Sequence, residues 1–225
     1  MPMKDTGRTD LVTIDRFDGG VGWLAHPDER MQRASHALST DDGVWLVDPV
    51  DADGLDDLLA EEGDVAGVVI LLDRHKRDAA RLANRYDVAV HIPSWMAGVA
   101  DDIDAPIERF DGELGETGYR LRMVATPLWQ EAALYGEEDG TLVVAEALGT
   151  AEYMRTDAER LGVHPMLRLL PPRQSFRDFM PEHVLVGHGA GIHDRASTAL
   201  SSALSGSRRR TPSLVAKAAR LVLSG

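Results

Sequence analysis

Residues 68–93 read VVILLDRHKRDAARLANRYDVAVHIP and combine a strand, a polar loop, a helix and a second strand. The apolar run 68–72 is short and rich in β-branched residues, which is typical of a strand buried on both faces. Apolar residues recur at helical spacing in 79–86, and 88–92 forms the second strand. The ionisable residues 73–78 therefore follow the carboxyl end of a buried strand, where open α/β sheets bind ligands.

The length and composition favour one globular domain that spans residues 1–225. The chain has no cysteine, which excludes disulfides and thiolate metal ligands. No apolar stretch approaches the roughly 20 residues of a membrane helix, and the N-terminus lacks the apolar core of a signal peptide. We therefore expect a cytoplasmic protein that has no membrane partner.

The charge balance is strongly acidic, with 37 Asp and Glu against 24 Lys and Arg and a net charge of −13. An acidic surface repels itself at low salt and is tolerated where salt screens it, so we expect a halophilic cytoplasm. The same charge argues against nucleic acid as a partner, because binding it requires cations that neutralise phosphates. A small-molecule substrate or ligand is the expected partner, and a homo-oligomer is compatible with the sequence.

Turn signals and hydrophobic patterns predict the other elements. Thr40 to Gly43 predicts the turn of a hairpin, and 55–62 predicts a short acidic helix that Gly63 closes. Alternation over 119–124 predicts a half-buried strand. Further strands are expected on both sides of the turn 136–140 and at 184–186, immediately before a Gly-His-Gly sequence.

The C-terminal third gives weaker patterns. The stretch 151–173 predicts helices with a turn that end at its two adjacent prolines. The basic run in 205–210 is interpreted as a solvated linker. Thr211 and Pro212 then form a favourable start for a C-terminal helix over 211–224.

Three residues of the central loop carry side chains that suit a metal ion. Asp73 and His75 lie on the same side of an extended chain, because side chains alternate with a period of two. Asp78 begins the following helix, where a carboxylate also gains from the helix dipole. Carboxylate and imidazole are ligands for zinc, manganese or iron, but solvated charges and a helix cap explain the same residues without a metal.

Two further candidates follow later strands. His188 is flanked by glycines, which let the backbone turn tightly and bring the imidazole into a cleft. Glu146 follows the apolar run 142–145, so its carboxylate is either a ligand or a capping group.

Taken in order, these motifs resemble the metallo-β-lactamase superfamily over roughly residues 10–195. The family's loop motif His-x-His-x-Asp-His corresponds to residues 73–78, and its Thr-Pro-Gly-His turn corresponds to 126–129. Its late Gly-His-Gly corresponds to 187–189. The resemblance implies an α/β (α+β) fold with four αββα layers, in which two mixed β-sheets are flanked by helices.

The same resemblance implies a degenerate metal motif. The family's first metal site corresponds to Asp73, His75 and Trp129, and its second to Arg77, Asp78 and His188. The bridging aspartate corresponds to Glu146. Two ligand positions are lost, and a cation stands in place of a carboxylate.

Two hypotheses follow from this set. The candidate ligands Asp73, His75, Asp78, Glu146 and His188, in some subset, hold one zinc, manganese or iron ion, and the protein is a hydrolase of ester, thioester or phosphoester bonds. Alternatively, no metal is bound, salt bridges from Arg77 replace the metals, and the protein is a non-catalytic binding or regulatory relative.

Overall fold

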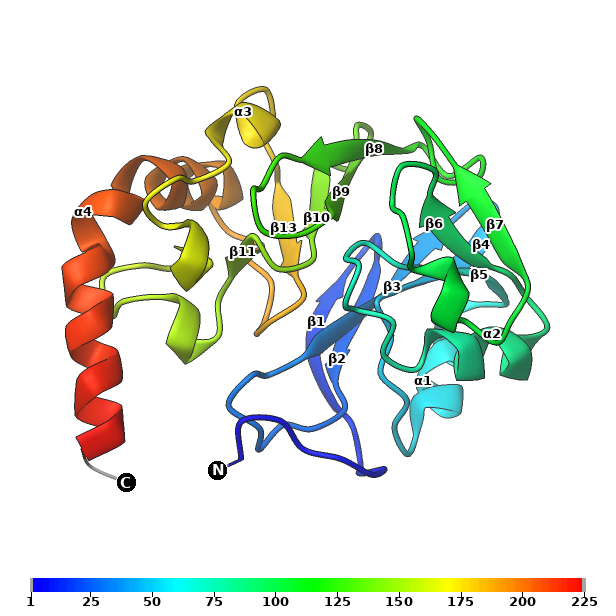
Figure 1. The fold of residues 1–225 in the computed structure, drawn as a ribbon. Helices are drawn as coiled ribbons and strands as arrows, with labels where there is room; N and C mark the ends of the chain where they lie inside the picture. Colours follow the sequence, from blue (N-terminus) through cyan, green and yellow to red (C-terminus); the bar gives the residue numbers. More distant parts are fainter. Residues whose placement is uncertain (1, 224–225) are drawn as a thin grey trace.

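The computed structural model describes residues 2–223, which form two large sheets with helices outside each (Figure 1). One sheet has seven strands in sequence order: β1 (Val12–Phe17), β2 (Gly20–Leu24), β3 (Ala34–Thr40), β4 (Gly43–Val47), β5 (Val65–Val69), β6 (Val90–Pro93) and β7 (Ile107–Phe110). The β1–β4 half is antiparallel, whereas β4 to β7 pair in parallel. The sheet is therefore mixed, as the resemblance implies.

The second sheet has the strand order β13-β10-β9-β8. Its strands are β8 (Tyr119–Val124), β9 (Glu131–Gly136), β10 (Thr141–Val144) and β13 (His183–Val186). β10 and β13 pair in parallel and the other pairs are antiparallel. A small two-stranded sheet, β11 (Leu148–Gly149) with β12 (Gly162–Val163), completes the β structure of the described residues.

Helices cover the outer side of each sheet, and one hydrophobic core joins the layers. In Figure 1, α1 (Leu55–Glu62) and α2 (Ala79–Tyr86) lie against the seven-stranded sheet. On the other side, α3 (Arg173–Phe176) and α4 (Ala196–Leu223) lie beside the four-stranded sheet. The predicted four-layer αββα architecture is therefore confirmed. None of the helices in the described part is both long and apolar enough to cross a membrane.

The stretch that follows β5 crosses from one sheet to the other. Ile70 still bonds to the first sheet, since its main-chain N–H donates to His91 O. Leu71 O then accepts from Ala132 N, and Leu72 forms an isolated bridge with Glu131 in the second sheet. The predicted strand 68–72 thus ends earlier as a ladder strand, at Val69. The crossing delivers residues 73–78 to the edge between the two sheets.

The prediction for 151–173 was wrong. This stretch holds two 3₁₀ turns, η2 (Glu152–Met154) and η3 (Pro165–Leu167), with β12 between them. Gly162 lies so close to the main chain of Met154 that an added Cβ would come within 2.1 Å of its carbonyl oxygen. This close approach and the β12 pairing hold the segment in an irregular form. A third 3₁₀ turn, η1 (Ala100–Asp102), lies earlier in the chain.

The predicted linker 205–210 and separate helix 211–224 also differ from the structure. Helix α4 is continuous from Ala196 to Leu223, and residue 224 lies outside the described residues. The basic run is exposed at Arg208 and Arg209 but is anchored at two points, because Arg208 donates to Leu169 O and Arg210 donates to Ser202 O. Ser207 is fully buried and donates to Arg168 O. These contacts hold the helix through Pro212.

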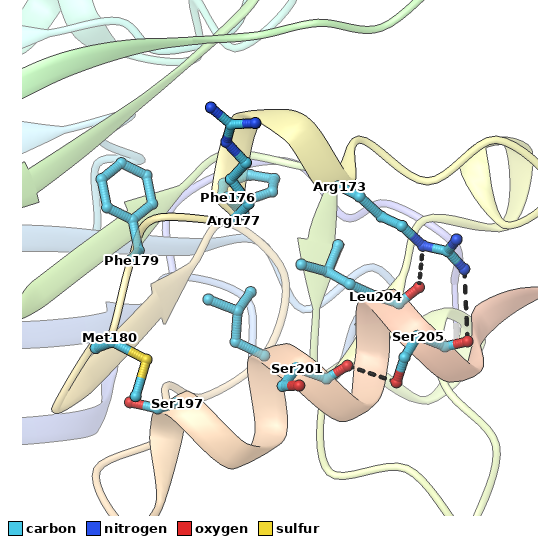
Figure 2. Close-up of a pocket in the computed structure, with 10 residues that line it drawn as sticks. Arg173, Phe176, Arg177, Phe179, Met180, Ser197, Ser201, Leu204 and Ser205 are labelled. Atoms are coloured by element: carbon cyan, nitrogen blue, oxygen red, sulfur yellow. Dashed lines mark hydrogen bonds between the residues drawn. The ribbon is translucent and has the colours of Figure 1, made fainter.

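Helix α3 is tied to α4 by Arg173. Figure 2 shows this side chain donating to the carbonyl oxygens of Leu204, at 3.0 Å, and Ser205, at 3.5 Å. Phe176 and Phe179 lie on the other side of the same cavity, which has a volume of about 490 Å³. The C-terminal helix is therefore part of the second outer layer.

A buried ion pair inside this layer gives a stability test. Glu159 and Arg168 are fully buried and in contact at 2.7 Å. We expect Glu159→Leu to lower the free energy of unfolding by about 3–5 kcal/mol, because it leaves the guanidinium of Arg168 without its carboxylate. Urea denaturation measures this change.

The matched control is Glu137→Leu, because Glu137 pairs with Arg120 on the surface. An exposed pair contributes little, so this variant should change the free energy by less than about 1 kcal/mol. Equal effects of the two substitutions would contradict the structural role of the buried pair.

Candidate metal centre

The imidazole of His75 is held by Asp48, which follows β4. His75 Nδ1 lies 2.9 Å from Asp48 Oδ2, while Asp48 Oδ1 accepts from Leu71 N. Burial raises the pKa of Asp48 to about 6, so the carboxyl is ionised at neutral pH and accepts the proton of Nδ1. Nε2 of His75 is then the nitrogen with a free lone pair, as in carboxylate–histidine–metal arrangements.

His188 is oriented in the same way from the other sheet. Its Nδ1 donates to Met31 O at 2.9 Å, and its Nε2 is buried with no hydrogen-bond partner among the described residues. The flanking glycines let the main chain adopt a crowded, left-handed path around His188, which a residue with a Cβ atom could not follow without strain. A Cβ on Gly187 would lie 2.1 Å from Ala145 O, and Gly189 has a φ of 92°. Burial lowers the pKa of both His75 and His188 well below the ordinary value, which keeps them neutral and able to bind a metal.

Glu146 completes the group from the end of β10. Its Oε2 accepts from Arg74 Nε at 2.9 Å, and Arg74 lies over the ring of Trp129, 4.3 Å from the centroid. Its Oε1 faces the histidines and lies 3.8 Å from His188 Nε2. The carboxylate is therefore held by one oxygen and offers the other.

Three potential ligand atoms thus converge. One atom each from His75, Glu146 and His188 lies within 4.8 Å of the others, and all three residues are buried. Two imidazole lone pairs and a carboxylate oxygen facing one another repel unless a cation or proton lies between them. The buried, unpartnered Nε2 of His188 therefore fits a bound metal ion. Two histidines and one carboxylate also form a known ligand set for catalytic zinc and for non-haem iron.

Solved structures with a similar fold agree with this architecture. The DIM-1 metallo-beta-lactamase is 10% identical, with 91% of this chain and 98% of that chain covered and a TM-score of 0.57. The Flv1 flavodiiron core from Synechocystis sp. PCC6803 is 11% identical, with 91% and 62% covered and a TM-score of 0.63. The chemotaxis sensor ODP from T. denticola is 14% identical, with 88% and 94% covered and a TM-score of 0.51. The chain has the metallo-β-lactamase fold. No protein-family model matches it, and no curated protein matches it by sequence.

Within this fold the converging residues come from different half-sites. The resemblance assigns His75 to the first metal position, Glu146 to the bridging position and His188 to the second metal position. The structure brings these three together at one point. These three residues could hold one metal ion.

Asp73 and Asp78, the other predicted ligands, are bonded elsewhere. Asp73 Oδ2 accepts from Gln130 N at 3.1 Å, which ties the loop to the second sheet. Asp78 Oδ2 accepts from Asp51 N at 3.0 Å at the start of α2. Both carboxylates therefore hold main-chain segments and are not among the three that converge.

Arg77 also differs from expectation. The hypothesis gave it salt bridges to carboxylates, but its guanidinium donates to three main-chain carbonyl oxygens. Nη1 donates to Ala34 O and to Asp48 O, and Nη2 donates to Gly187 O at 3.0 Å. Arg77 has a φ of 41°, so the chain turns in the left-handed region and directs the side chain toward the strand ends.

Two residues beside the centre carry no signal in the sequence. Tyr153 stacks edge-on against His188, with ring centroids 5.9 Å apart, and its hydroxyl is buried without a partner among the described residues. Burial and, to a smaller extent, Glu146 raise its pKa. His164 Nδ1 accepts from Met166 N, so Nε2 carries the proton and cannot bind a metal in this tautomer. Both belong to 151–173, where no hydrophobic period marks a site.

The three acceptors of Arg77 give a second stability test. We expect Arg77→Met to lower the free energy of unfolding by about 3–5 kcal/mol, because it removes three hydrogen bonds from a charged donor, each worth roughly 1.5–3 kcal/mol. The loss is smaller than their sum, since Asp48 O still accepts from Ser35 Oγ and Gly187 O from Ala34 N. Urea denaturation of the metal-free protein, treated with EDTA, measures this loss without a contribution from bound ions.

Arg120→Met is the control, because Arg120 is exposed and pairs only with exposed Glu137 in the described structure. This variant should stay close to the wild type. A wild-type-like stability of Arg77→Met would show that its guanidinium does not hold the strand ends together.

Proposed function

We propose that the chain binds one divalent metal ion through His75, Glu146 and His188 and hydrolyses ester, thioester or phosphoester bonds. One observation carries this proposal: the buried Nε2 of His188 faces Glu146 Oε1 and the His75 imidazole with no other partner in the described structure. Zinc, manganese and iron all accept imidazole and carboxylate together. The similar folds of metallo-beta-lactamases and flavodiiron proteins support the proposal at the level of architecture.

The surrounding side chains prepare the centre for such an ion. When bound, the ion would polarise a carbonyl or phosphoryl oxygen and lower the pKa of a coordinated water. Asp48 fixes the tautomer of His75, and Met31 O fixes that of His188. Arg74 restrains Glu146 through its second oxygen. The ring of Tyr153 packs against His188, and its buried, unpartnered hydroxyl could donate a hydrogen bond to a substrate oxygen.

A second candidate is a metal-binding protein with a regulatory function and no catalysis. Its specific support is closure of the centre, since His188 is 0% exposed and His75 and Glu146 are each 6% exposed. Trp129, at a position that resembles a family ligand, is itself buried and lies beneath Arg74. A chemotaxis sensor among the structural neighbours shows that the fold is also used for sensing.

Metal content tests the shared part of both candidates. We expect protein incubated with zinc, manganese or ferrous iron and then desalted to retain about one ion per chain, because the three ligands form one site. His188→Ala should lower the affinity at least about tenfold, the smallest loss seen even for residues behind the ligands. Elemental analysis and chelator competition give the two readouts.

His183→Ala is the matched control, because His183 is a partly exposed imidazole that bonds to His193 away from the centre. It should bind the metal as the wild type does. Wild-type protein that retains none of the three metals would contradict the site.

Activity separates the two candidates. We expect the metal-loaded protein, assayed at high salt against ester, thioester and phosphodiester substrates, to turn over at least one class and to lose that activity on His188→Ala. His183→Ala should remain active. A metal-loaded protein that is inactive toward the whole panel, including as the Arg74→Ala variant that uncovers Glu146, would favour the regulatory function.

A further inference from the structure

A second cavity lies beside the metal centre, between the N-terminal segment, the start of β3 and the loop before α2. Its volume is about 410 Å³, which suits a small molecule. None of the three candidate metal ligands lines it. The cavity is therefore a separate site, reached from a different set of side chains.

Positive charge is concentrated around this cavity. Its lining includes five of the 24 basic residues of a chain whose net charge is −13: Lys4, Arg8, Arg33, Arg77 and Arg81. Only three carboxylates, those of Asp5, Asp51 and Asp78, line it with them. A cluster of cations on an acidic protein attracts anions locally to the extent that its members are not paired with carboxylates.

Part of this charge is already neutralised within the protein. Arg8 lies 2.9 Å from Asp53 and Arg81 lies 3.3 Å from Asp51. Arg33 binds Glu29 through two nitrogens, at 2.7 and 2.8 Å. Asp51 also accepts from Arg85, which lies outside the lining. Among the described residues, Lys4 and Arg77 are therefore the lining cations that have no carboxylate within 4.0 Å.

Three lining groups keep unused capacity for hydrogen bonds. No ion pair within 4.0 Å is found for Lys4 among residues 2–223, although it belongs to the cavity wall. The Nε atom of Arg77 is buried without a partner in the same part of the chain. His26 is only 5% exposed, and its Nδ1 likewise has no partner there. The two buried atoms cost free energy unless a ligand or water satisfies them, whereas the exposed ammonium of Lys4 is free to contact a ligand.

We propose that this cavity binds a phosphate group, either free or carried by a small metabolite. Cationic side chains reach it from four separate segments, so their donors approach from several directions. A tetrahedral phosphate offers oxygens in as many directions, whereas a carboxylate has two coplanar oxygens that match a single guanidinium fork. The inference does not depend on a bound metal or on catalysis.

Calorimetric titration with inorganic phosphate tests the site on the intact protein, treated with EDTA and kept at constant ionic strength in chloride. We expect saturable binding that is tighter than that of acetate. Lys4→Met should weaken it about tenfold, because it removes one charged hydrogen-bond donor from the cavity wall. Lys4 is exposed and has no ion pair in the described structure, so this variant should fold normally.

Lys217→Met is the matched control, because it removes the same charge at a distant position paired with Asp157. It should leave phosphate binding unchanged. The His188→Ala variant should also bind phosphate, so a failure of the metal site does not affect the result.

Three outcomes would overturn the proposal. These are no saturable phosphate binding by the wild type, equal affinity for acetate, and equal losses in Lys4→Met and Lys217→Met. If inorganic phosphate binds as expected, a phosphorylated metabolite that binds more tightly would identify the group as part of a larger ligand.

Discussion

The side chain of Arg77 lies between the two sheets and bonds to the main chain of both. The guanidinium of Arg77 receives no carboxylate in the described structure but collects carbonyl oxygens from the start of β3, the residue after β4 and the glycine after β13. These are strand ends of both sheets, so this side chain strengthens a junction that the main-chain bonds Ala34 N to Gly187 O and Gly189 N to Gln32 O also make. A metal ion would fix ligand side chains at such a point, whereas Arg77 fixes the main chain.

The metal centre depends on the same arrangement. The carbonyl oxygen of Asp48 accepts a hydrogen bond from Arg77, and its carboxylate accepts one from His75. Gly187, which directly precedes His188, also accepts from Arg77 through its carbonyl oxygen. Because each histidine donates through Nδ1, both Nε2 atoms remain free for a cation. The guanidinium thus positions the backbone from which two of the three candidate ligands extend.

Apolar runs, turns and the order of motifs predict both sheets, α1 and α2, and they also predict that His75, Glu146 and His188 follow buried strands. They do not predict where a polar side chain points. Asp73 and Asp78 bind main-chain N–H groups instead of joining the centre. The left-handed turn at Arg77 occurs without a glycine, so the sequence gives no signal for it. Tyr153 and His164 lie in a segment that tertiary contacts, not periodicity, hold in place.

Helix α4 reaches well beyond the layer that it covers. Its Lys217 pairs with Asp157, its Arg210 lies 3.6 Å from Glu159, and its Ser207 holds Arg168 O. These contacts stabilise the irregular segment, in which Tyr153 and His164 lie beside the candidate metal centre. Amino-acid changes far along this helix would therefore shift the segment that holds Tyr153 and His164, so the C-terminal region influences the surroundings of the candidate metal centre from a distance.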